Sequence, residues 1–216
     1  MKLYTYFRSS AAYRVRIALA LKGLSWTPEP VHMLRGGGEQ HAPGYSAIHP
    51  QRLVPVLEDQ GGLLIQSIAI CEYLEETHPT PPLLPADPVA RAYVRSIANA
   101  VACEIHPLNN LRVLKYVTST LGHSDEERTA WIRHWIADGF AALEAIIAGA
   151  KLSGSFSYGD TPGLAEAFLV PQIYNARRFN CDMSAYPTLT RIDGNCSERP
   201  EFRIAHPDAQ VDANAA

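Results

Sequence analysis

Two adjacent serines, Ser9 and Ser10, stand where an alternating, aromatic segment gives way to a helical pattern. A hydroxyl at a helix N-terminus can hydrogen-bond an anion, and the helix dipole and unpaired N–H groups add to that stabilisation. A thiol with the ordinary pKa of about 8.5 would therefore ionise closer to neutral pH at this position. Taken alone, such a serine is more often only a helix cap.

Two further pairs of adjacent residues could bind other parts of a ligand. Val54-Pro55 precedes a predicted strand, and a cis bond there would turn the Val54 backbone N–H and C=O toward a peptide ligand. Only about 5–6% of X–Pro bonds are cis, so the sequence leaves this open. Gln66-Ser67 ends a strand and opens a helix, where a hydroxyl and helical N–H groups could bind a carboxylate. Helix capping alone also explains Ser67.

The cysteines and histidines indicate what the chain does not do. The first strand–helix junction reads Ser-Ser-Ala-Ala and holds no cysteine, which excludes disulfide exchange by a thiol of the chain at this place. The eight histidines do not cluster, and no nucleotide-binding glycine motif or metalloprotease motif is present. We expect no bound metal. We also expect four reduced thiols, because the cysteines are widely spaced: Cys71, Cys103, Cys181 and Cys196.

The elements that would position these residues alternate over the first 80 residues. Gly23 ends the first helix, and Pro28 and Pro30 place the second strand at a sheet edge. Gly61-Gly62 permits a tight turn between the last two strands, and a weak short helix can follow the loop 35–38. The order β-α-β-α-β-β-α predicts an α/β thioredoxin-like domain over 1–80. We expect strands at 2–6, 26–33, 53–58 and 63–66, and helices at 11–22 and 67–77.

A second, all-helical domain is predicted after a linker. Residues 79–88 contain five prolines, which no helix or strand interior tolerates. Asp87-Pro88 and Ser124 to Glu127 are helix-start signals, the second a capping box. We expect this domain over 87–207 and a flexible tail over 208–216. Its helices are predicted at 89–119 with a break at Pro107, then 124–148, 163–179, 188–196 and 201–205.

Composition narrows the class of protein. The chain has 216 residues, 47% hydrophobic and 19% charged, with a net charge of −3. A charge so near neutral argues against a nucleic-acid partner. No apolar run approaches the ~18–20 residues of a membrane span. The first residues lack the apolar core of a signal peptide, so we expect a cytoplasmic protein without a membrane partner.

Together, the three residue pairs, the proline-rich linker and the helical domain resemble a glutathione transferase. The likeness is closer still to the zeta class, the maleylacetoacetate and maleylpyruvate isomerases, and it covers nearly the whole chain. The stretches that carry it are Tyr4–Ser10, Tyr13–Gly23, Gln66–Glu76, Pro79–Pro85, Ile105–Asn110 and Leu169–Gln172.

This resemblance implies a glutathione cofactor, a homodimer and a set of site residues. Ser9 and Ser10 would be catalytic, beside the glutathione sulfur. The substrate's carboxylate ends would be bound by Arg8, His106, Arg112 and Arg178, with Arg177 as the neighbouring rival of Arg178. The cofactor-binding residues would be Ser9, Ser10, Arg14, Gln40, Val54, Gln66 and Ser67, with His106, Asn110 and Arg112 on the helical side.

Three positions depart from the class pattern. Ala11 stands where many members have cysteine, so that cysteine is not needed here. His49 stands where Asn-Pro is usual, and the sequence gives no reason for it. Gly163-Leu-Ala-Glu166 replaces a Ser/Thr-x-x-Asp capping box, for which we expect a small loss of stability.

The reaction implied is glutathione-dependent cis–trans isomerisation of maleylacetoacetate or maleylpyruvate to the fumaryl isomer, in aromatic compound catabolism. Ile105-His106-Pro107, which bacterial maleylpyruvate isomerases share, inclines the choice slightly to maleylpyruvate. Two alternatives stay open: a general transferase that conjugates electrophiles or haloacids, and a non-catalytic binding protein on the same fold. Retention of Ser9, Gln66 and Ser67 counts against the second.

Overall fold

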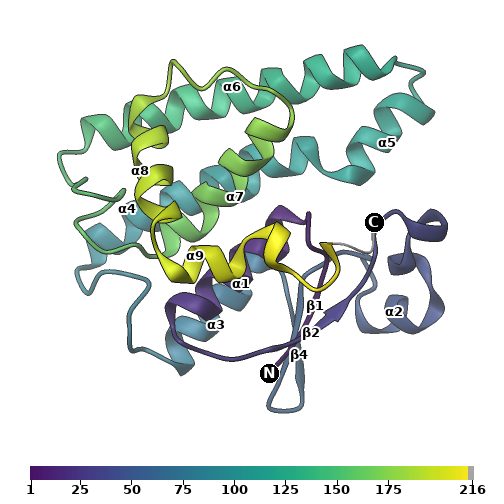
Figure 1. Ribbon diagram of the computed structural model, residues 1–216, viewed down its shortest axis with the longest axis horizontal. Helices are drawn as coiled ribbons and strands as arrows, with labels where there is room; N and C mark the ends of the chain where they lie inside the picture. Colours follow the sequence, from purple (N-terminus) through teal and green to yellow (C-terminus); the bar gives the residue numbers. More distant parts are fainter. Residues whose placement is uncertain (214–216) are drawn as a thin grey trace. The chain divides into compact units, whose positions relative to one another are not determined.

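The computed structural model describes residues 1–213, which form two compact units (Figure 1). The first unit comprises Met1–Leu84 together with the described residues from Ser197 onward, and the second comprises Pro85–Cys196. Within residues 1–213, no helix is both long enough and apolar enough to cross a membrane.

The first unit is built on a four-stranded sheet in the order β2-β1-β3-β4. β2 runs parallel to β1, whereas the β1–β3 and β3–β4 pairs are antiparallel. The two prolines in β2 cannot donate to a ladder, and β2 indeed lies at the edge, as the sequence predicts. The strands are β1 (Lys2–Thr5), β2 (Thr27–Pro30), β3 (Val56–Asp59) and β4 (Gly62–Ile65).

Four α-helices accompany this sheet. Nearly all of α1 is buried, and it packs against both α3 and α9. The predicted stop at Gly23 is confirmed, because this glycine has a left-handed φ of 65° just after the helix. The helices are α1 (Ser10–Leu21), α2 (Pro43–Ile48), α3 (Ser67–Thr77) and α9 (Pro200–Ala205), with short 3-10 turns at Arg35–Gly37, Glu39–His41 and Pro207–Ala209.

Two local predictions in this unit are corrected. The hairpin turn centres on Gln60 and Gly61, with φ of 47° and 78°, and Gly62 already pairs with Asp59. A type I′ turn needs left-handed backbone at both central positions, and here a glutamine takes one of them. The N-cap of α3 is Gln66, so Ser67 is the first helical residue and not the cap.

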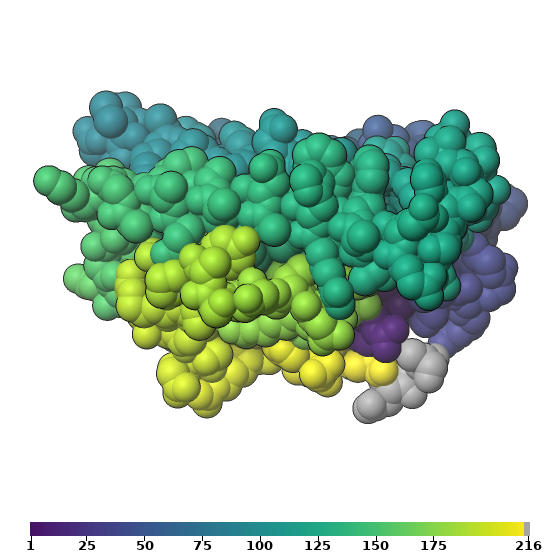
Figure 2. All heavy atoms as spheres, turned by 90° about the horizontal axis from the view of Figure 1, so that it is seen from above, coloured from purple at the N-terminus to yellow at the C-terminus, as the bar shows by residue number. Residues whose placement is uncertain are grey.

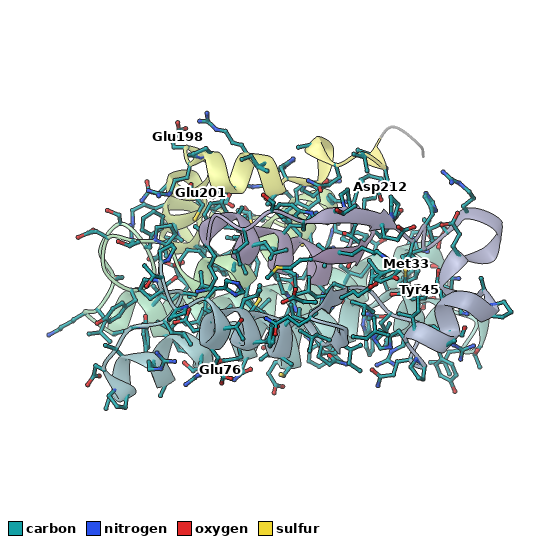
Figure 3. All side chains as sticks on the ribbon, turned by 90° about the horizontal axis from the view of Figure 1, so that it is seen from below. Met33, Tyr45, Glu76, Glu198, Glu201 and Asp212 are labelled. Atoms are coloured by element: carbon teal, nitrogen blue, oxygen red, sulfur yellow. The ribbon has the colours of Figure 1, made fainter. Side chains whose placement is uncertain are left out.

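A hydrophobic cluster beside β1 forms part of the core of the first unit. Met33 and Ala213 pack against it, and Figure 3 labels Met33 and Tyr45 in this region. We call it the β1 cluster, and its buried members are Tyr6, Phe7, Val31, Tyr45, Val54 and Val56.

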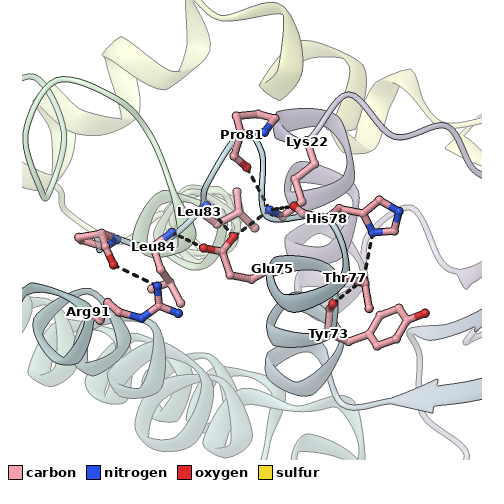
Figure 4. A network of polar contacts seen from close by, with 10 residues as sticks. Lys22, Tyr73, Glu75, Thr77, His78, Pro81, Leu83, Leu84 and Arg91 are labelled. Carbon is pink, nitrogen blue, oxygen red and sulfur yellow. Dashed lines mark hydrogen bonds and ion pairs between the residues drawn. The ribbon is translucent and has the colours of Figure 1, made fainter. Parts of the chain in front are cut away.

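A buried ion pair fixes the start of the proline-rich linker to the first unit (Figure 4). Lys22 Nζ lies 2.8 Å from Glu75 Oε2, and the two side chains are 0% and 7% exposed. Because this pair also binds linker backbone, the unit extends to Leu84 and not only to the predicted residue 80. The backbone partners are the carbonyls of His78 and Pro81, at 2.7 and 3.0 Å, and the N–H groups of Leu83 and Leu84, at 2.8 and 3.2 Å.

The second unit is mostly helical, with an isolated β-bridge between Ser153 and Gly159 in the segment before α7. The predicted break at Pro107 is present, but the helix already widens to a π-helix at Ala100 before a 3-10 turn begins at His106. The long helix α6, teal to green in Figure 2, presents a row of exposed side chains. The elements are α4 (Pro88–Asn99), the π-helix Ala100–Ile105, the 3-10 turn His106–Asn109, α5 (Leu111–Ser119), α6 (Asp125–Gly149), α7 (Leu164–Arg178) and α8 (Pro187–Ser197).

The central helix α7 starts without a hydroxyl cap. Gly163 is its N-cap, and its N–H donates to Glu166 Oε2 at 2.8 Å. The other carboxylate oxygen of Glu166 accepts from the Ser157 N–H at 2.8 Å. Burial nevertheless raises the pKa of Glu166, since desolvation outweighs these bonds. The glutamate therefore supplies the reciprocal half of a capping box that glycine cannot complete.

The predictions for the C-terminal part need correction. The sequence predicts a helical domain that reaches residue 207, but α9 packs on α1 in the first unit. Arg16 Nε donates to the Ala205 carbonyl at 3.0 Å, which ties this segment to α1. The predicted flexible tail 208–216 has an anchor point at Asp212, which is 5% exposed and accepts from the Phe7 N–H at 2.9 Å. Residues 214–216 of that prediction lie outside the described chain.

Candidate active site

Ser9 caps α1, and its hydroxyl keeps a proton to donate. Its backbone is extended (φ −70°, ψ 114°), and its Oγ accepts from the Ala12 N–H at 3.2 Å. This bond uses an oxygen lone pair, so the hydroxyl proton remains available to an anion at the helix start. Ser10 is 7% exposed and is the first residue of the helix. Arg8 is exposed, with its guanidinium 4.9 Å from the centre of the Phe7 ring.

Arg14 brings positive charge to the start of α3, where it contacts the Ser67 hydroxyl. Arg14 is 2% exposed and donates from Nη1 to Ser67 Oγ at 3.1 Å. The N-cap Gln66 has a left-handed φ of 70°, an unfavourable conformation for a residue with a side chain. Its Nε2 donates to Gln51 Oε1 at 3.0 Å. The buried cation of Arg14, the hydroxyl of Ser67 and the N-terminus of α3 together suit the binding of a carboxylate.

Val54 offers main-chain groups. The Val54–Pro55 bond is cis, which settles the alternative that the sequence left open. Val54 is 7% exposed, and within residues 1–213 neither its N–H nor its C=O forms a backbone hydrogen bond. Those two groups suit an extended peptide ligand.

Gln40 lies in a loop that His32 holds in shape. Gln40 is 3% exposed; its Nε2 donates to the Met33 carbonyl at 3.3 Å, and its Oε1 is buried without a partner among the described residues. His32 Nδ1 accepts from the N–H groups of Leu34 and Arg35 at 3.3 and 2.8 Å. Sequence reasoning missed His32, because nothing local reveals that a ring nitrogen caps this loop.

His49, which the sequence left unexplained, stabilises the turn before Val54. It is 1% exposed, its carbonyl accepts from the Arg52 N–H at 2.8 Å, and its Nδ1 accepts from the Gln51 N–H at 3.3 Å. Burial lowers the pKa of His49, which favours the neutral ring that can accept this bond.

The thiol of Cys71, in α3, is inert. Cys71 is fully buried, and burial raises its pKa to about 12 although the positive charge of Arg14 acts in the opposite direction. A thiolate at this site therefore has to come from a ligand. Among the described residues, no group of three His, Cys, Asp or Glu side chains could hold a metal ion.

The helical unit carries the other predicted residues. His106 begins the 3-10 turn, Asn110 caps α5 by accepting from the Arg112 N–H at 3.1 Å, and the Arg112 side chain is exposed. Arg177 forms an ion pair with Asp193. Arg178 is exposed and has no ion pair within the described chain, which favours it over its neighbour for an anionic ligand.

Asn109 is a further polar group that the sequence did not single out. Both polar atoms of its side chain are buried without a hydrogen-bond partner among residues 1–213. The only sequence signal was its place inside the stretch Ile105–Asn110.

Comparison with known proteins decides the family. The glutathione S-transferase N-terminal domain model matches residues 3–82. The maleylacetoacetate isomerase of Pseudomonas aeruginosa is 49% identical over 217 residues, covering 100% of both chains. A solved holo maleylpyruvate isomerase, described as a bacterial zeta-class glutathione transferase, superimposes with a TM-score of 0.96 at 46% identity, covering 99% of this chain and 100% of the other. The chain belongs to the zeta-class glutathione transferases.

Another solved relative contains bound ligands. The maleylacetoacetate isomerase of Methylobacterium extorquens, solved with malonate and glutathione, has a TM-score of 0.95 at 38% identity, covering 99% of both chains. The predicted fold class is confirmed: the first unit is thioredoxin-like and the second is helical, as in other zeta-class transferases.

Proposed function

We propose that the chain is a glutathione-dependent cis–trans isomerase that converts maleylacetoacetate or maleylpyruvate into its fumaryl isomer. The observation that carries the proposal is Ser9, which presents a donor hydroxyl at a helix N-terminus that holds no thiol of the chain itself. Full-length similarity to isomerases of this name supports the choice of reaction.

The groups of the first unit fit glutathione. Gln66, Ser67 and the buried Arg14 suit a carboxylate, and the Val54 main chain suits the peptide portion. The buried Oε1 of Gln40 is an acceptor that a ligand N–H would satisfy. When bound, glutathione supplies the thiolate that adds reversibly to the conjugated double bond, which allows that bond to rotate.

Each of these residues then has a stated task. Ser9 donates to the sulfur and, with the N-terminus of α1, keeps it ionised, while Ser10 is the neighbouring candidate for the same contact. The substrate carries negative ends and gains negative charge during the reaction. We assign Arg8, Arg112 and Arg178 to that charge, because all three are exposed and arginine binds carboxylates through two parallel hydrogen bonds. His106, Asn110 and Arg112 remain the proposed contributions of the helical unit to the site.

A product assay tests the proposed reaction. Purified protein is given each maleyl substrate with and without glutathione, and both fumaryl product and total glutathione are measured. The proposal expects turnover only with glutathione, at constant total glutathione. Loss of glutathione in step with substrate would indicate a conjugating transferase, and failure to bind glutathione would indicate a binding protein without catalysis.

The arginines give the sharpest test of the substrate class. Arg112→Met and Arg178→Met should each slow maleyl-substrate turnover, since a lost charge-assisted contact costs on the order of 2 kcal/mol. Glutathione affinity should stay nearly unchanged in Arg178→Met, which lies outside the proposed cofactor-binding residues, and in neither variant should a neutral conjugation substrate share the loss. Arg177→Met is the matched control, since that arginine is already paired with Asp193. Equal losses on charged and neutral substrates would contradict a role in binding carboxylates.

We also propose that the protein works as a homodimer in the cytoplasm, in the breakdown of aromatic compounds. Family membership and the prevalence of two-fold dimers support the assembly. The wide spacing of the four cysteines, which form no C-x-x-C pair, is usual in a reducing compartment. Light scattering should give twice the 23.7 kDa of one chain. A mass near that of a single chain would exclude the dimer.

A further inference from the structure

Charged side chains bind the turn before Ser9 from two sides. The fully buried Arg16 donates to the carbonyls of Tyr6 and Phe7 at 3.5 and 3.1 Å. The Phe7 N–H donates to Asp212 Oδ2 at 2.9 Å. The Tyr6 carbonyl also accepts from the Ser9 N–H at 2.9 Å, which closes the turn. The peptide unit between Tyr6 and Phe7 is thus bound by a cation at its C=O and by an anion at its N–H.

The segment that carries Asp212 is itself well anchored. Gln210 Nε2 donates to the carbonyls of Ile204 and His206 at 3.0 and 2.9 Å. One residue beyond Asp212, Ala213 packs against the β1 cluster. Figure 3 labels Asp212 on this last described stretch, and its side chain is 5% exposed. The carboxylate is therefore held at a fixed place beside the turn.

We propose that residues 205–213 form a strap that positions the turn carrying Arg8 and Ser9, with Asp212 as the positioning residue. The inference rests on the proposed function, because it matters only if Ser9 contacts the glutathione sulfur. Asp212 acts through the Phe7 N–H and touches neither cofactor nor substrate.

The strap can affect rate because the turn is short and precedes Ser9 directly. A hydrogen bond from a backbone N–H to a carboxylate is charge-assisted and among the stronger ones in a protein. Without the acceptor, the Phe7 N–H is left unpaired at a buried residue, and the turn has to move to satisfy it. A shift of about 1 Å in a catalytic group can cost up to ~100-fold in rate.

Three variants of the full chain test the strap. Asp212→Ala removes the acceptor, Asp212→Asn keeps an acceptor oxygen without the charge, and Asp208→Ala changes an exposed carboxylate of the same segment. We expect Asp212→Ala to lower kcat on the order of tenfold and to raise the pKa of the bound glutathione thiol. The glutathione Kd should stay close to that of the wild type, because Arg14, Gln66 and Ser67 are untouched. Asp212→Asn should recover most of the rate, and Asp208→Ala should behave as the wild type.

The outcomes separate this inference from the proposed function. A wild-type protein without glutathione-dependent isomerase activity would overturn the function itself. An active wild type with an Asp212→Ala variant of unchanged kcat and thiol pKa would overturn only the strap. So would an Asp212→Asn variant that loses as much as Asp212→Ala. If Asp212→Ala does not fold, Gln210→Ala loosens the strap without touching the turn, and it should lower kcat in the same direction; an unchanged kcat there also overturns the strap.

Discussion

At the scale of single residues, the Ser9 hydroxyl combines two hydrogen-bonding roles. As an acceptor it caps α1 through the Ala12 N–H, and as a donor it is available to a sulfur. A cap of this kind stabilises a helix by about 1 kcal/mol, whereas a hydrogen bond to a charged group is worth about 1.5–3 kcal/mol. The catalytic role should therefore dominate the effect of removing it.

Ser9→Ala should keep the fold and lower kcat/KM about 10- to 150-fold, the loss that a missing hydrogen bond to a charged sulfur predicts. Its unfolding free energy should fall by only about 1 kcal/mol, from the lost cap. Ser10→Ala is the matched variant and should lose less activity. Isomerase kinetics and urea unfolding of both proteins measure this. If Ser9→Ala has the wild-type kcat/KM and Ser10→Ala has a lowered one, Ser10 and not Ser9 contacts the sulfur.

Ser67→Ala should affect binding more than chemistry. Its hydroxyl lies beside the buried Arg14 at the start of α3, a place suited to a carboxylate remote from the sulfur. Such a contact is the same in the ground and transition states, so the KM for glutathione should rise while kcat changes little. Steady-state kinetics with varied glutathione measures both. A fall in kcat alone would place Ser67 at the reacting atoms.

At the scale of elements, local sequence signals predict most of the helices and strands. Features that depend on contacts between residues distant in the sequence could not be predicted. Prolines placed β2 at the edge, Gly23 ended α1, and Ser124 with Glu127 began α6, because each acts within its own turn. The left-handed Gln60 could not be predicted, since register with the partner strand decides it. The same limit applies to the site. Ser9 and Ser67 could be predicted because each lies at the start of a helix. His32 and Asn109 could not, because their roles depend on neighbours distant in the sequence.

The ion pair between α1 and α3 gives a prediction at this scale. Glu75→Gln leaves the buried Lys22 ammonium without its anion, and breaking a buried pair from one side typically costs about 3–5 kcal/mol. Glu76→Gln, at the exposed next position labelled in Figure 3, should change stability little and serves as the control. Denaturant unfolding monitored by circular dichroism measures both variants. Equal stability of the two would mean that the linker is not held by this pair.

At the scale of the whole molecule, the helical unit is inserted into the first unit. The chain leaves the first unit after Leu84 and returns to it at Ser197. This return could not be predicted from the sequence, because residues 208–216 are small and polar and resemble a frayed end. What anchors the segment is tertiary: Phe202 and Ala205 are 2% and 0% exposed, and the buried Arg16 donates to the Ala205 carbonyl. The first unit therefore depends on residues from both ends of the chain.

A fragment that stops at Leu84 should consequently fail to unfold cooperatively, although it contains the whole sheet. It lacks Phe202, whose burial is worth about 1.5–3 kcal/mol, and it leaves the Arg16 guanidinium without one buried acceptor, which costs about 1–3 kcal/mol more. Those losses are comparable to the ~5 kcal/mol that a domain of this size commonly has in total. Adding a peptide of residues 197–213 should restore a cooperative thermal transition, followed by circular dichroism, and should make its midpoint depend on peptide concentration. The same peptide with Phe202→Ala should restore far less. A fragment that melts cooperatively at the same temperature with and without the peptide would show that the returning segment is dispensable for the fold of this unit.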